Sequence, residues 1–332
     1  MKKNILVKNY KSKLSIYDTQ IAIKLVKDTF QKKLAKELEL NRVSAPLFVE
    51  PSTGLNDNLS GVEKAVGFNI LENNQRLEIV QSLAKWKRHA LNKYNTSGIY
   101  TDMNAIRPNE YSDNIHSLYV DQWDWEKVIS KEDRNINYLK NIVNKIYKAL
   151  KETSIVLKEK YDVLDINLPE EITFISSQEV VDMYPSLTNK EREYEVAKKY
   201  GAVFLMNIGN KLNDGNVFDT RASDYDDWSL NGDILVYYDV LDIALELSSM
   251  GIRVDKDSLL SQLKEKNEEF KINLPYHQDI INERLPLTIG GGIGQSRMCM
   301  FMLNKAHIGE VQVSYWSKED ISLFKEYNIH LL

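Results

Sequence analysis

The chain contains few of the residues that cross-link or interrupt a fold. Its 332 residues include one cysteine, Cys299, and seven prolines. A single cysteine excludes an internal disulfide, a cysteine-rich zinc site and the disulfide framework of small secreted proteins, so we expect a protein of the reducing cytoplasm. Repeats, low-complexity tracts and linkers rich in proline, glycine or serine are also missing. Their absence predicts one continuous domain over residues 1–332.

Long apolar runs and a large excess of one charge are missing as well. The apolar stretch 202–206 is far shorter than the ~20 residues that a membrane span needs, and no apolar stretch follows the first four residues. Lys and Arg number 43 against 48 Asp and Glu, a net charge of -5. This balance argues against nucleic acid or a membrane as a partner. We expect a water-soluble globular protein.

Several well-known nucleotide-binding and catalytic motifs are absent. The dipeptide Gly-Lys occurs nowhere, which excludes a P-loop. The run Gly290-Gly291-Gly292-Ile293-Gly294-Gln295 has glutamine where a dinucleotide fingerprint needs its third glycine, and no βαβ unit follows it. The histidines lack metalloprotease spacing and lie near no nucleophile elbow, so each is predicted to be structural or exposed. They are His89, His116, His277, His307 and His330.

Periodicity and capping signals predict the main helices and strands. Thr188 and Glu191 form a capping box, and Gly201 is a typical helix end. The predicted elements are helices over about 17–39, 139–150 and 188–201, and buried strands over 202–206 and 234–238. Because helices separate the strands irregularly, the pattern favours an α+β fold over a doubly wound parallel sheet.

A glycine cluster near the end of the chain carries a phosphate-binding signal. Gly290 to Gly294 lead into an amphipathic helix, and Arg297 lies three residues after the last glycine. Glycine allows close backbone approach to a ligand, helix N-termini attract anions, and an arginine in the first turn can reach a phosphate. The pattern indicates a polyphosphate site, although glycines before a helix can also serve close packing alone.

A second cluster lies between residues 107 and 126. It begins with Arg107-Pro108-Asn109-Glu110, and further along Gln122, Asp124 and Glu126 alternate with bulky residues. On a strand these three polar side chains would share one face and form the floor of a site. An exposed amphipathic strand of an antiparallel sheet gives the same alternation, so that alternative stays open.

The two clusters together resemble motifs 2 and 3 of class II aminoacyl-tRNA synthetases, in particular the aspartate/asparagine subgroup. Motif 2 in those enzymes reads Arg-x-Glu, whereas Arg107 and Glu110 are separated by two residues, so we expect a different turn here. Four further segments, with the clusters, resemble ammonia-dependent asparagine synthetase, or aspartate:ammonia ligase, from about Tyr17 to Trp316. These segments are Asp57-Asn58-Leu59-Ser60-Gly61, Gln81-Ser82-Leu83-Ala84-Lys85-Trp86-Lys87-Arg88, Tyr225-Asp226-Asp227-Trp228-Ser229 and Glu246-Leu247-Ser248-Ser249-Met250-Gly251-Ile252-Arg253.

The resemblance implies a class II aminoacyl-tRNA synthetase-like antiparallel sheet flanked by helices, and a homodimer. It also implies conversion of aspartate, ATP and ammonia into asparagine, AMP and diphosphate through a β-aspartyl-adenylate. Two steps make chemical sense because a carboxylate is a poor electrophile, whereas its mixed anhydride offers AMP as a leaving group to ammonia.

The resemblance implies an ATP site, whose residues are found by matching this sequence to the motifs of the family. Arg107 would steady the α-phosphate during transfer, and Arg297 would bind the γ-phosphate near the adenine. Glu246 would hold Mg²⁺ between phosphates, with Asp233 as a second acidic candidate, because hard oxygen ligands suit this ion. The remaining nucleotide-binding candidates are Ser249, Gly292 and Gly294.

Aspartate carries an ammonium and two carboxylates, so its site needs charges of both signs. The resemblance implies that Lys87 recognises one carboxylate and that Arg253 clamps the other end of the substrate. Acceptors for the substrate ammonium or for ammonia would come from Asp57, Gln122, Asp124 and Asp226, with Ser82, Ser117 and His116 as further candidates. A carboxylate beside the anhydride could attract ammonium and take its proton, and Asp57 is the preferred candidate.

Ammonia is favoured as the nitrogen source because glutamine-dependent transfer needs a nucleophilic cysteine. Cys299 lies between methionines in a predicted helix, where we expect a buried, inert thiol. Two alternatives stay open. A tRNA-charging core would need an anticodon-binding module, and little chain precedes Tyr17. A catalytically silent relative would be indicated by loss of the motif arginines, but Arg107 and Arg297 are both present.

Overall fold

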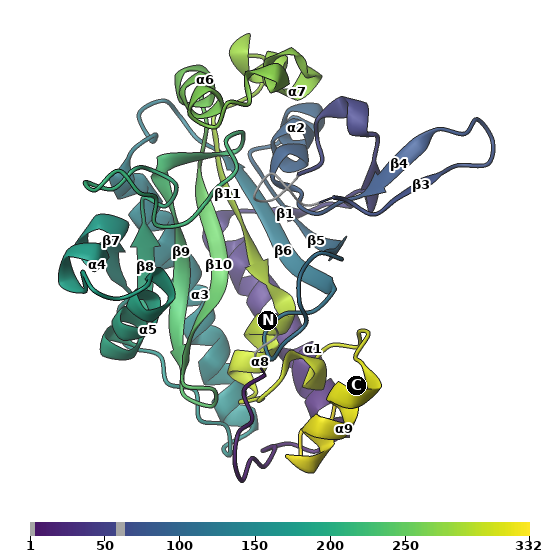
Figure 1. The fold of residues 1–332 in the computed structure, drawn as a ribbon, viewed down its shortest axis with the longest axis vertical. Coiled ribbons are helices and arrows are strands. Elements are labelled where there is room, and N and C mark those ends of the chain that lie inside the picture. The colour runs from purple at the N-terminus through teal and green to yellow at the C-terminus, as the bar shows by residue number, and fades with distance from the viewer. Residues whose placement is uncertain (1–3, 58–63) are drawn as a thin grey trace.

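A computed structural model describes residues 4–57 and 64–332, built around an eight-stranded sheet (Figure 1). In spatial order its strands are β1 (Asn41–Arg42), β5 (Gly98–Ile106), β6 (Tyr119–Val128), β11 (Thr288–Gly294), β10 (Ile243–Arg253), β9 (Asp226–Tyr238), β8 (Ala202–Met206) and β7 (Thr173–Ser176). The pairs from β5 to β8 are antiparallel, and the edge pairs β1–β5 and β7–β8 are parallel. The predicted antiparallel sheet is confirmed.

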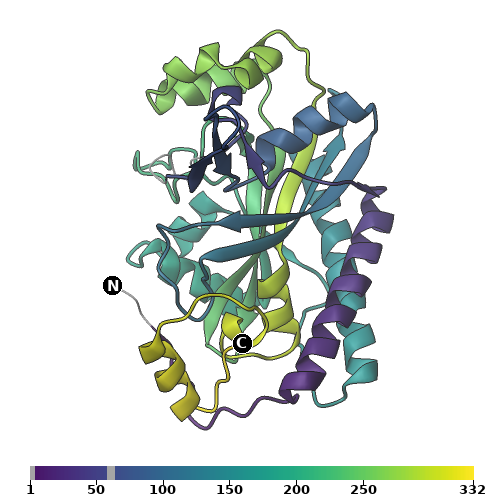
Figure 2. The ribbon, with the colours of Figure 1, turned by 90° about the vertical axis from the view of Figure 1, so that its right-hand side faces the viewer.

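Helices α1 (Ile16–Leu38) and α3 (Ile136–Lys160) pack against each other and cover one face of this sheet (Figures 1 and 2). Helix α8 (Gln295–Met302) continues directly from β11 and packs on α1 and β6. The other helices are α2 (Ala84–Tyr94), α4 (Ser177–Met183), α5 (Asn189–Tyr200), α6 (Lys256–Glu265), α7 (Pro275–Ile281) and α9 (Lys318–Glu326), with short 3-10 turns over Pro51–Thr53, Glu269–Asn273 and Ile308–Glu310.

Capping and apolar spacing explain why α1 forms where it does. The side chain of Ser15 accepts a hydrogen bond from the backbone N–H of Asp18, which satisfies one of the exposed donors of the first turn. Val26, Phe30 and Leu34 recur every four residues and are fully buried, so one stripe of the helix faces the core. The helix is thereby held on the sheet by its apolar stripe rather than by propensity alone.

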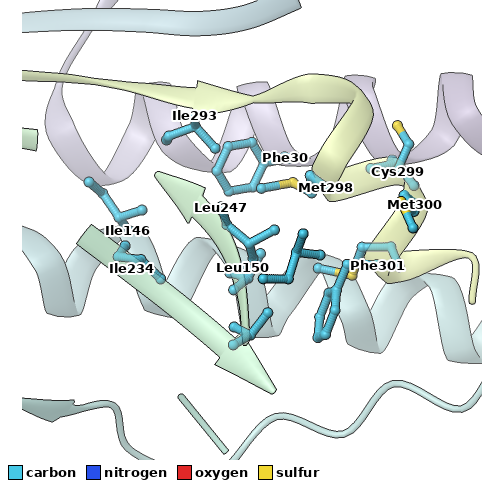
Figure 3. Packing of buried hydrophobic residues seen from close by; sticks show 14 of the residues in the cluster. Phe30, Ile146, Leu150, Ile234, Leu247, Ile293, Met298, Cys299, Met300 and Phe301 are labelled. Carbon is cyan, nitrogen blue, oxygen red and sulfur yellow. The ribbon is translucent and has the colours of Figure 1, made fainter. Parts of the chain in front are cut away.

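The main core fills the space between the sheet and these helices. Trp123 and Trp125 on β6 are fully buried, and the ring of Phe30 on α1 lies 4.8 Å from that of Trp123. Figure 3 shows Phe30 next to Met298 of α8 and Leu247 of β10. The bulky residues of β6 therefore point into the core, and the alternative of an exposed strand is wrong.

The opposite face of the sheet is polar. On β6 this face carries Gln122, Asp124 and Glu126, as the alternation predicted. Strand register places Asp124 next to Gly292, Gly292 next to Ser249, and Ser249 next to Asp233. A row of small and acidic residues thus crosses four adjacent strands.

A three-stranded sheet of β2 (Phe48–Val49), β4 (Arg76–Ile79) and β3 (Gly67–Asn69) lies beside the large sheet, and its β3–β4 hairpin projects outward (Figure 1). It follows the segment that resembles the ligase family at 57–61, of which residues 58–61 lie outside the described residues. Within the described part of the chain, no helix combines the length and apolarity that a bilayer crossing requires.

The helix and strand predictions are confirmed in type, with differences in length. Helix α5 begins at Asn189 after the Thr188–Glu191 capping box, ends at Tyr200, and leads into β8 as predicted. The predicted strand at 234–238 is the last part of the longer strand β9, because polar residues at its start concealed its extent. The glycine cluster 290–294 lies in strand β11 and leads directly into helix α8, as the sequence predicted for the helix.

Candidate active site

A cavity of about 420 Å³ lies over the polar face of the large sheet. It brings together residues from widely separated parts of the sequence, and Asp233 lies beside it in the strand next to Ser249. The sequence-predicted residues that line it are Asp57, Ser82, Lys87, Arg107, His116, Ser117, Gln122, Asp124, Asp226, Glu246, Ser249, Arg253, Gly292, Gly294 and Arg297.

Two arginines reach the cavity from different elements. Arg107 follows β5 and donates hydrogen bonds to the backbone oxygen of Gln81 and to Glu110, each at 3.3 Å. Arg297 lies in the first turn of α8 and donates to the backbone oxygen of Glu246 at 3.2 Å, with the Glu246 carboxylate 3.7 Å away. Arg107 and Arg297 line the same cavity, as their resemblance to the arginines of motifs 2 and 3 predicted.

Besides Arg107, Arg253 and Arg297, a fourth arginine, Arg221, lines the cavity, and it was not among the residues predicted from the sequence. It forms an ion pair with Asp233, and its Nη1 lies 3.4 Å from Oγ of Ser249. Burial disfavours its charge, but the carboxylates around it, Asp233 first and then Glu246 and Asp219, together outweigh burial and raise the pKa of Arg221. The available signal was its position just ahead of the segment 225–229, which resembles the ligase family.

One end of the cavity carries buried ion pairs. Lys87 of α2 pairs with Asp124 and donates to the backbone oxygen of Gly291 at 2.9 Å. Arg253, at the end of β10, holds Glu126 through Nε and Nη2 and Asp226 through Nη1. The predicted substrate-binding charges are therefore paired with one another across the floor of the site.

Burial and pairing shift the protonation of these groups. Burial lowers the pKa of the Lys87 ammonium, and the nearby carboxylate of Asp124 opposes this shift. Burial would raise the pKa of Glu126, but Arg253 outweighs it and lowers the pKa of this carboxyl. Burial raises the pKa of Asp226 despite the same arginine. Charges of both signs in a small buried volume match the functional groups of an acidic amino acid.

Glu126 is a second functional residue whose role the sequence did not reveal. It is fully buried beneath the cavity and also accepts a hydrogen bond from Thr288 at 2.7 Å. Alternation predicted that it would face the floor of the site, but not that it would hold Arg253. Only the register of β6 beside β11 and β10 reveals that arrangement.

The glycines of β11 serve close packing. A Cβ on Gly290 would lie 1.9 Å from Oε2 of Glu126, and a Cβ on Gly292 would lie 2.5 Å from Oε1 of Gln122. Gly292 and Gly294 also line the cavity. The absence of side chains on this strand therefore leaves room both for the polar groups of β6 and for the cavity itself.

The carboxylates proposed from sequence as metal ligands lie near each other on β9 and β10. Glu246 lines the cavity, and burial together with the nearby charge of Glu246 raises the pKa of Asp233. Oδ1 of Asp233 is buried without a hydrogen-bond partner among the described residues. Groups of three or more histidine, cysteine or acidic residues that could hold a metal are not found in residues 4–57 and 64–332.

The remaining candidates hold the walls of the cavity. Oγ of Ser82 accepts from the backbone N–H of Ala84 at the start of α2, and Ser117 donates to Ser314 at 2.6 Å. His116 lies 2.9 Å from Asp113, so it is anchored locally while it lines the cavity.

Two further residues discussed from the sequence lie in different places: Asp57 lines the cavity, whereas Cys299 lies in the core. Asp57 is buried at the cavity wall, and its backbone oxygen accepts from the side chain of Gln81 at 2.8 Å. Cys299 is fully buried in the core, and burial raises the pKa of its thiol to about 12. The expected burial of the thiol is confirmed, and a buried thiol with a raised pKa is a poor nucleophile.

Comparison with known proteins gives a consistent family. The family model described as Aspartate-ammonia ligase matches residues 17–328. An aspartate--ammonia ligase of Fusobacterium nucleatum subsp. nucleatum is 60% identical over 97% of this chain and 99% of its own length. An aspartate--ammonia ligase of Clostridium perfringens is 55% identical over 100% of both chains.

Solved structures share the fold at low sequence identity. An asparaginyl-tRNA synthetase of Pyrococcus horikoshii complexed with asparaginyl-adenylate matches with a TM-score of 0.64 and 16% identity, over 89% of this chain and 68% of that one. An asparaginyl-tRNA synthetase of Entamoeba histolytica matches with a TM-score of 0.61 and 13% identity, over 90% and 66%. These likenesses establish the synthetase-like fold that the motifs predicted.

Proposed function

Because the chain belongs to the aspartate–ammonia ligase family, it is an enzyme that makes asparagine from aspartate, ammonia and ATP, and we propose that the 420 Å³ cavity is its active site. The observation that carries this proposal is the meeting of Arg107 and Arg297 in one cavity with the buried charges around Lys87 and Arg253. The two arginines suit the phosphates, and the paired charges suit aspartate.

The first step is attack of the substrate β-carboxylate on the α-phosphorus of ATP. An oxygen–phosphorus bond forms, the bond to the diphosphate breaks, and β-aspartyl-adenylate and diphosphate result. Negative charge grows on the phosphoryl oxygens, and the guanidinium of Arg107 would stabilise it. Arg297 would bind the terminal phosphate, and Arg221 adds a further positive charge to the lining of the cavity. Ser249, Gly292 and Gly294 leave space along the nucleotide.

The buried ion pairs would form the part of the site that binds aspartate. Arg253 is held by Glu126 and Asp226, so its guanidinium is fixed in orientation before substrate arrives. Lys87 and Asp124 offer charges of opposite sign to a substrate carboxylate and ammonium. Pre-organisation of this kind favours one orientation of aspartate, with its β-carboxylate toward the ATP site.

The second step is attack of ammonia on the activated carbonyl carbon. A carbon–nitrogen bond forms, AMP leaves with the electrons of the anhydride bond, and one proton must be removed from the nitrogen. Asp57 is our candidate for the group that attracts ammonium and accepts the proton, since it lines the cavity and is buried. Gln122, Ser82 and Ser117 would orient the reactants from the walls.

Glu246 and Asp233 fit the role of ligands to a phosphate-bound Mg²⁺. Their carboxylate oxygens are the donors that this ion prefers, and the buried Oδ1 of Asp233 lacks a hydrogen-bond partner among the described residues. When bound, the ion would supply charge neutralisation on the phosphates. Two protein ligands suffice for an ion that keeps water and phosphate oxygens as its other partners.

We expect the enzyme to act as a cytoplasmic homodimer on small molecules, without nucleic acid. A single, buried cysteine is compatible with a reducing compartment, and the net charge of -5 disfavours an RNA partner. Sedimentation analysis checks the homodimer directly, because twice the chain mass of 38.5 kDa separates clearly from the monomer.

An isotope experiment tests the proposed adenylate. Aspartate labelled with ¹⁸O in its β-carboxylate is incubated with ATP and ¹⁵N-ammonium. We expect one ¹⁸O in the AMP and ¹⁵N in the side-chain amide of asparagine, because the attacking oxygen leaves with the phosphate. Asparagine formed together with unlabelled AMP would contradict the adenylate.

A further inference from the structure

The first turn of α8 lacks the usual means of fixing a helix start. Its N-cap residue is Gly294, which has no side chain to accept a backbone hydrogen bond, and its first turn contains no acidic residue. Helices normally satisfy these donors with a capping side chain, and a glycine cap leaves them to other groups. This turn carries Arg297, so its position sets where that guanidinium reaches the cavity.

A carboxylate from a neighbouring strand supplies the missing cap. Asp121 of β6 accepts a hydrogen bond from the backbone N–H of Ser296 at 3.0 Å through Oδ1. The same oxygen accepts from the side chain of Gln312 at 3.2 Å, and Gln312 also donates to Oγ of Ser296 at 2.9 Å. Ser296 in the first turn of α8 is thereby linked to Asp121 of β6 twice, once directly and once through the side chain of Gln312.

The second oxygen of Asp121 is held from the other side. Nζ of Lys27 on α1 lies 3.1 Å from Oδ2, and the lysine side chain is about one-third exposed while Asp121 is buried. Burial disfavours the charge of Lys27, but Asp121, together with smaller contributions from Cys299 and Tyr119, outweighs burial and raises the pKa of the lysine. The carboxylate is therefore fixed between α1, β6 and α8, and its negative charge faces the positive end of the α8 dipole.

We infer that Asp121 is a positioning residue for ATP binding, which acts through the first turn of α8 to place Arg297. This inference rests on the proposed role of Arg297 at the ATP phosphates. Asp121 is among the residues that line the cavity, but both of its carboxylate oxygens accept hydrogen bonds from protein donors. Its effect on ATP should therefore pass through Arg297 rather than through direct contact.

A double-mutant cycle on ATP affinity tests the inference. ATP binding without aspartate is measured by calorimetry on the full chain for the wild type, Asp121→Ala, Arg297→Ala and the double variant. We expect Asp121→Ala to weaken binding about tenfold in the wild-type background, the size of a lost helix cap, and less than about twofold once Arg297 is absent. Equal losses in both backgrounds would overturn the inference.

Two further variants separate positioning from general stability. Asp121→Asn keeps an oxygen that can face the Ser296 N–H and loses the charge, so it should weaken ATP binding only about threefold. Asp28→Ala removes an exposed carboxylate of α1, paired with Lys24, and should leave ATP binding unchanged. If Asp121→Ala does not fold, the cycle is run with Asp121→Asn, and an unchanged affinity for ATP in that variant overturns the inference.

The test of Asp121 measures ATP affinity and does not depend on turnover. If the wild type formed no asparagine, the proposed function would be contradicted, whereas the role of Asp121 is decided by ATP affinity alone. Faster hydrogen exchange of the Ser296 amide in Asp121→Ala, with ATP affinity unaltered, would reduce Asp121 to a structural cap and overturn its role at the site.

Discussion

The guanidinium of Arg107 uses only part of its hydrogen-bonding capacity within the protein. Two of its nitrogens donate to Gln81 and Glu110, and its Nε is buried without a hydrogen-bond partner among the described residues. Leaving such a donor unsatisfied is unfavourable in a folded protein, and a ligand oxygen would satisfy it. The side chain thus carries hydrogen-bonding capacity that the protein alone does not use.

Arg107→Ala should lower the rate of aspartate activation by about 10²–10³, the effect of removing one donor from a transition-state charge. Arg284→Ala, which removes an exposed arginine paired with Asp279, is the control and should retain the wild-type rate. Initial rates of diphosphate release in the presence of aspartate measure both. A near-normal rate for the Arg107 variant, with its fold intact by circular dichroism, would refute the assigned role.

Glu126→Gln should raise the KM for aspartate more than the KM for ATP, because Arg253 loses its charged partner beneath the substrate. It should also reduce the free energy of unfolding by about 1–3 kcal/mol, since the buried guanidinium is left less well satisfied. Thr288→Val removes only one hydrogen bond to the same carboxylate and should have a smaller effect of the same kind. Steady-state kinetics and urea unfolding provide both readouts, and an unchanged KM for aspartate would contradict this role of Glu126.

Residue-level prediction from sequence succeeded where the resemblance named a side chain and failed where a partner had to be known. Lys87, Asp124 and Arg253 line one cavity as expected, but the ion pairs Lys87–Asp124 and Arg253–Asp226 depend on contacts between elements that are distant in the sequence. Arg221 lies in a loop and matches no quoted motif, so the sequence provided no reason to place it beside Asp233.

Strand β11 links the core to the active site at the scale of one element. Its glycines follow the register of β6 and β10, and the carboxylate of Glu126 occupies the volume where a side chain at position 290 would lie. The strand then continues into α8 and so delivers Arg297 to the cavity. This one segment thus packs closely against β6 and β10 and leads to a residue that lines the cavity.

Gly290→Ala should destabilise the protein by about 1–3 kcal/mol and raise the KM for aspartate, because its Cβ would displace Glu126 and, at 2.6 Å, Nη2 of Arg253. Gly215→Ala is the control for stability, since its Cβ would meet no atom within 4 Å but its φ of +84° disfavours alanine. That control should be destabilised by about 1 kcal/mol with normal kinetics. If both variants changed KM alike, the packing argument would fail.

The sequence predicted the helices and strands that have capping residues or a clear apolar pattern. It did not predict the elements that lack such local features. The capping box at Thr188 and the glycine at position 201 gave both ends of α5. The start of β9 is polar because Asp226 serves Arg253, so alternation and hydrophobicity detected only its last residues. The short strands of the small sheet depend on pairing within that sheet, which no local pattern encodes.

A buried carboxyl that does not itself line the cavity affects the stability of the whole molecule. Glu310 accepts hydrogen bonds from Tyr10 and from the backbone N–H groups of Ala306 and His307, and burial raises its pKa to about 7 from a usual value of 4.5. The folded state therefore holds this proton more tightly than the unfolded chain. Between pH 4.5 and 7 its contribution must reduce stability as the pH rises.

Glu310→Gln should remove this contribution. Relative to the wild type, the variant should gain up to about 3 kcal/mol in free energy of unfolding between pH 5 and pH 8, with most of the gain below pH 7. Urea unfolding at several pH values measures the difference, and Glu159→Gln at the exposed end of α3 serves as the control. A constant difference across this range would show that Glu310 does not titrate as described.

At the scale of the whole molecule, the sequence predicted the type of fold because the quoted segments occur in family order along nearly the whole chain. The α+β layout and the antiparallel sheet followed from that order and from the irregular spacing of the strands. The convergence of the segments on one cavity could be expected only through the resemblance, since residues 107 and 297 are brought together by strands β5, β6 and β11.

The central claim is that one cavity activates aspartate with ATP and needs no nucleic acid. Exchange of labelled diphosphate into ATP, measured with RNA-free enzyme in the presence and absence of aspartate and then with ammonium, tests it most directly. We expect exchange that requires aspartate and Arg107, followed by formation of asparagine and AMP when ammonium is added. Exchange independent of aspartate, or activation that yields no asparagine with ammonium, would contradict it.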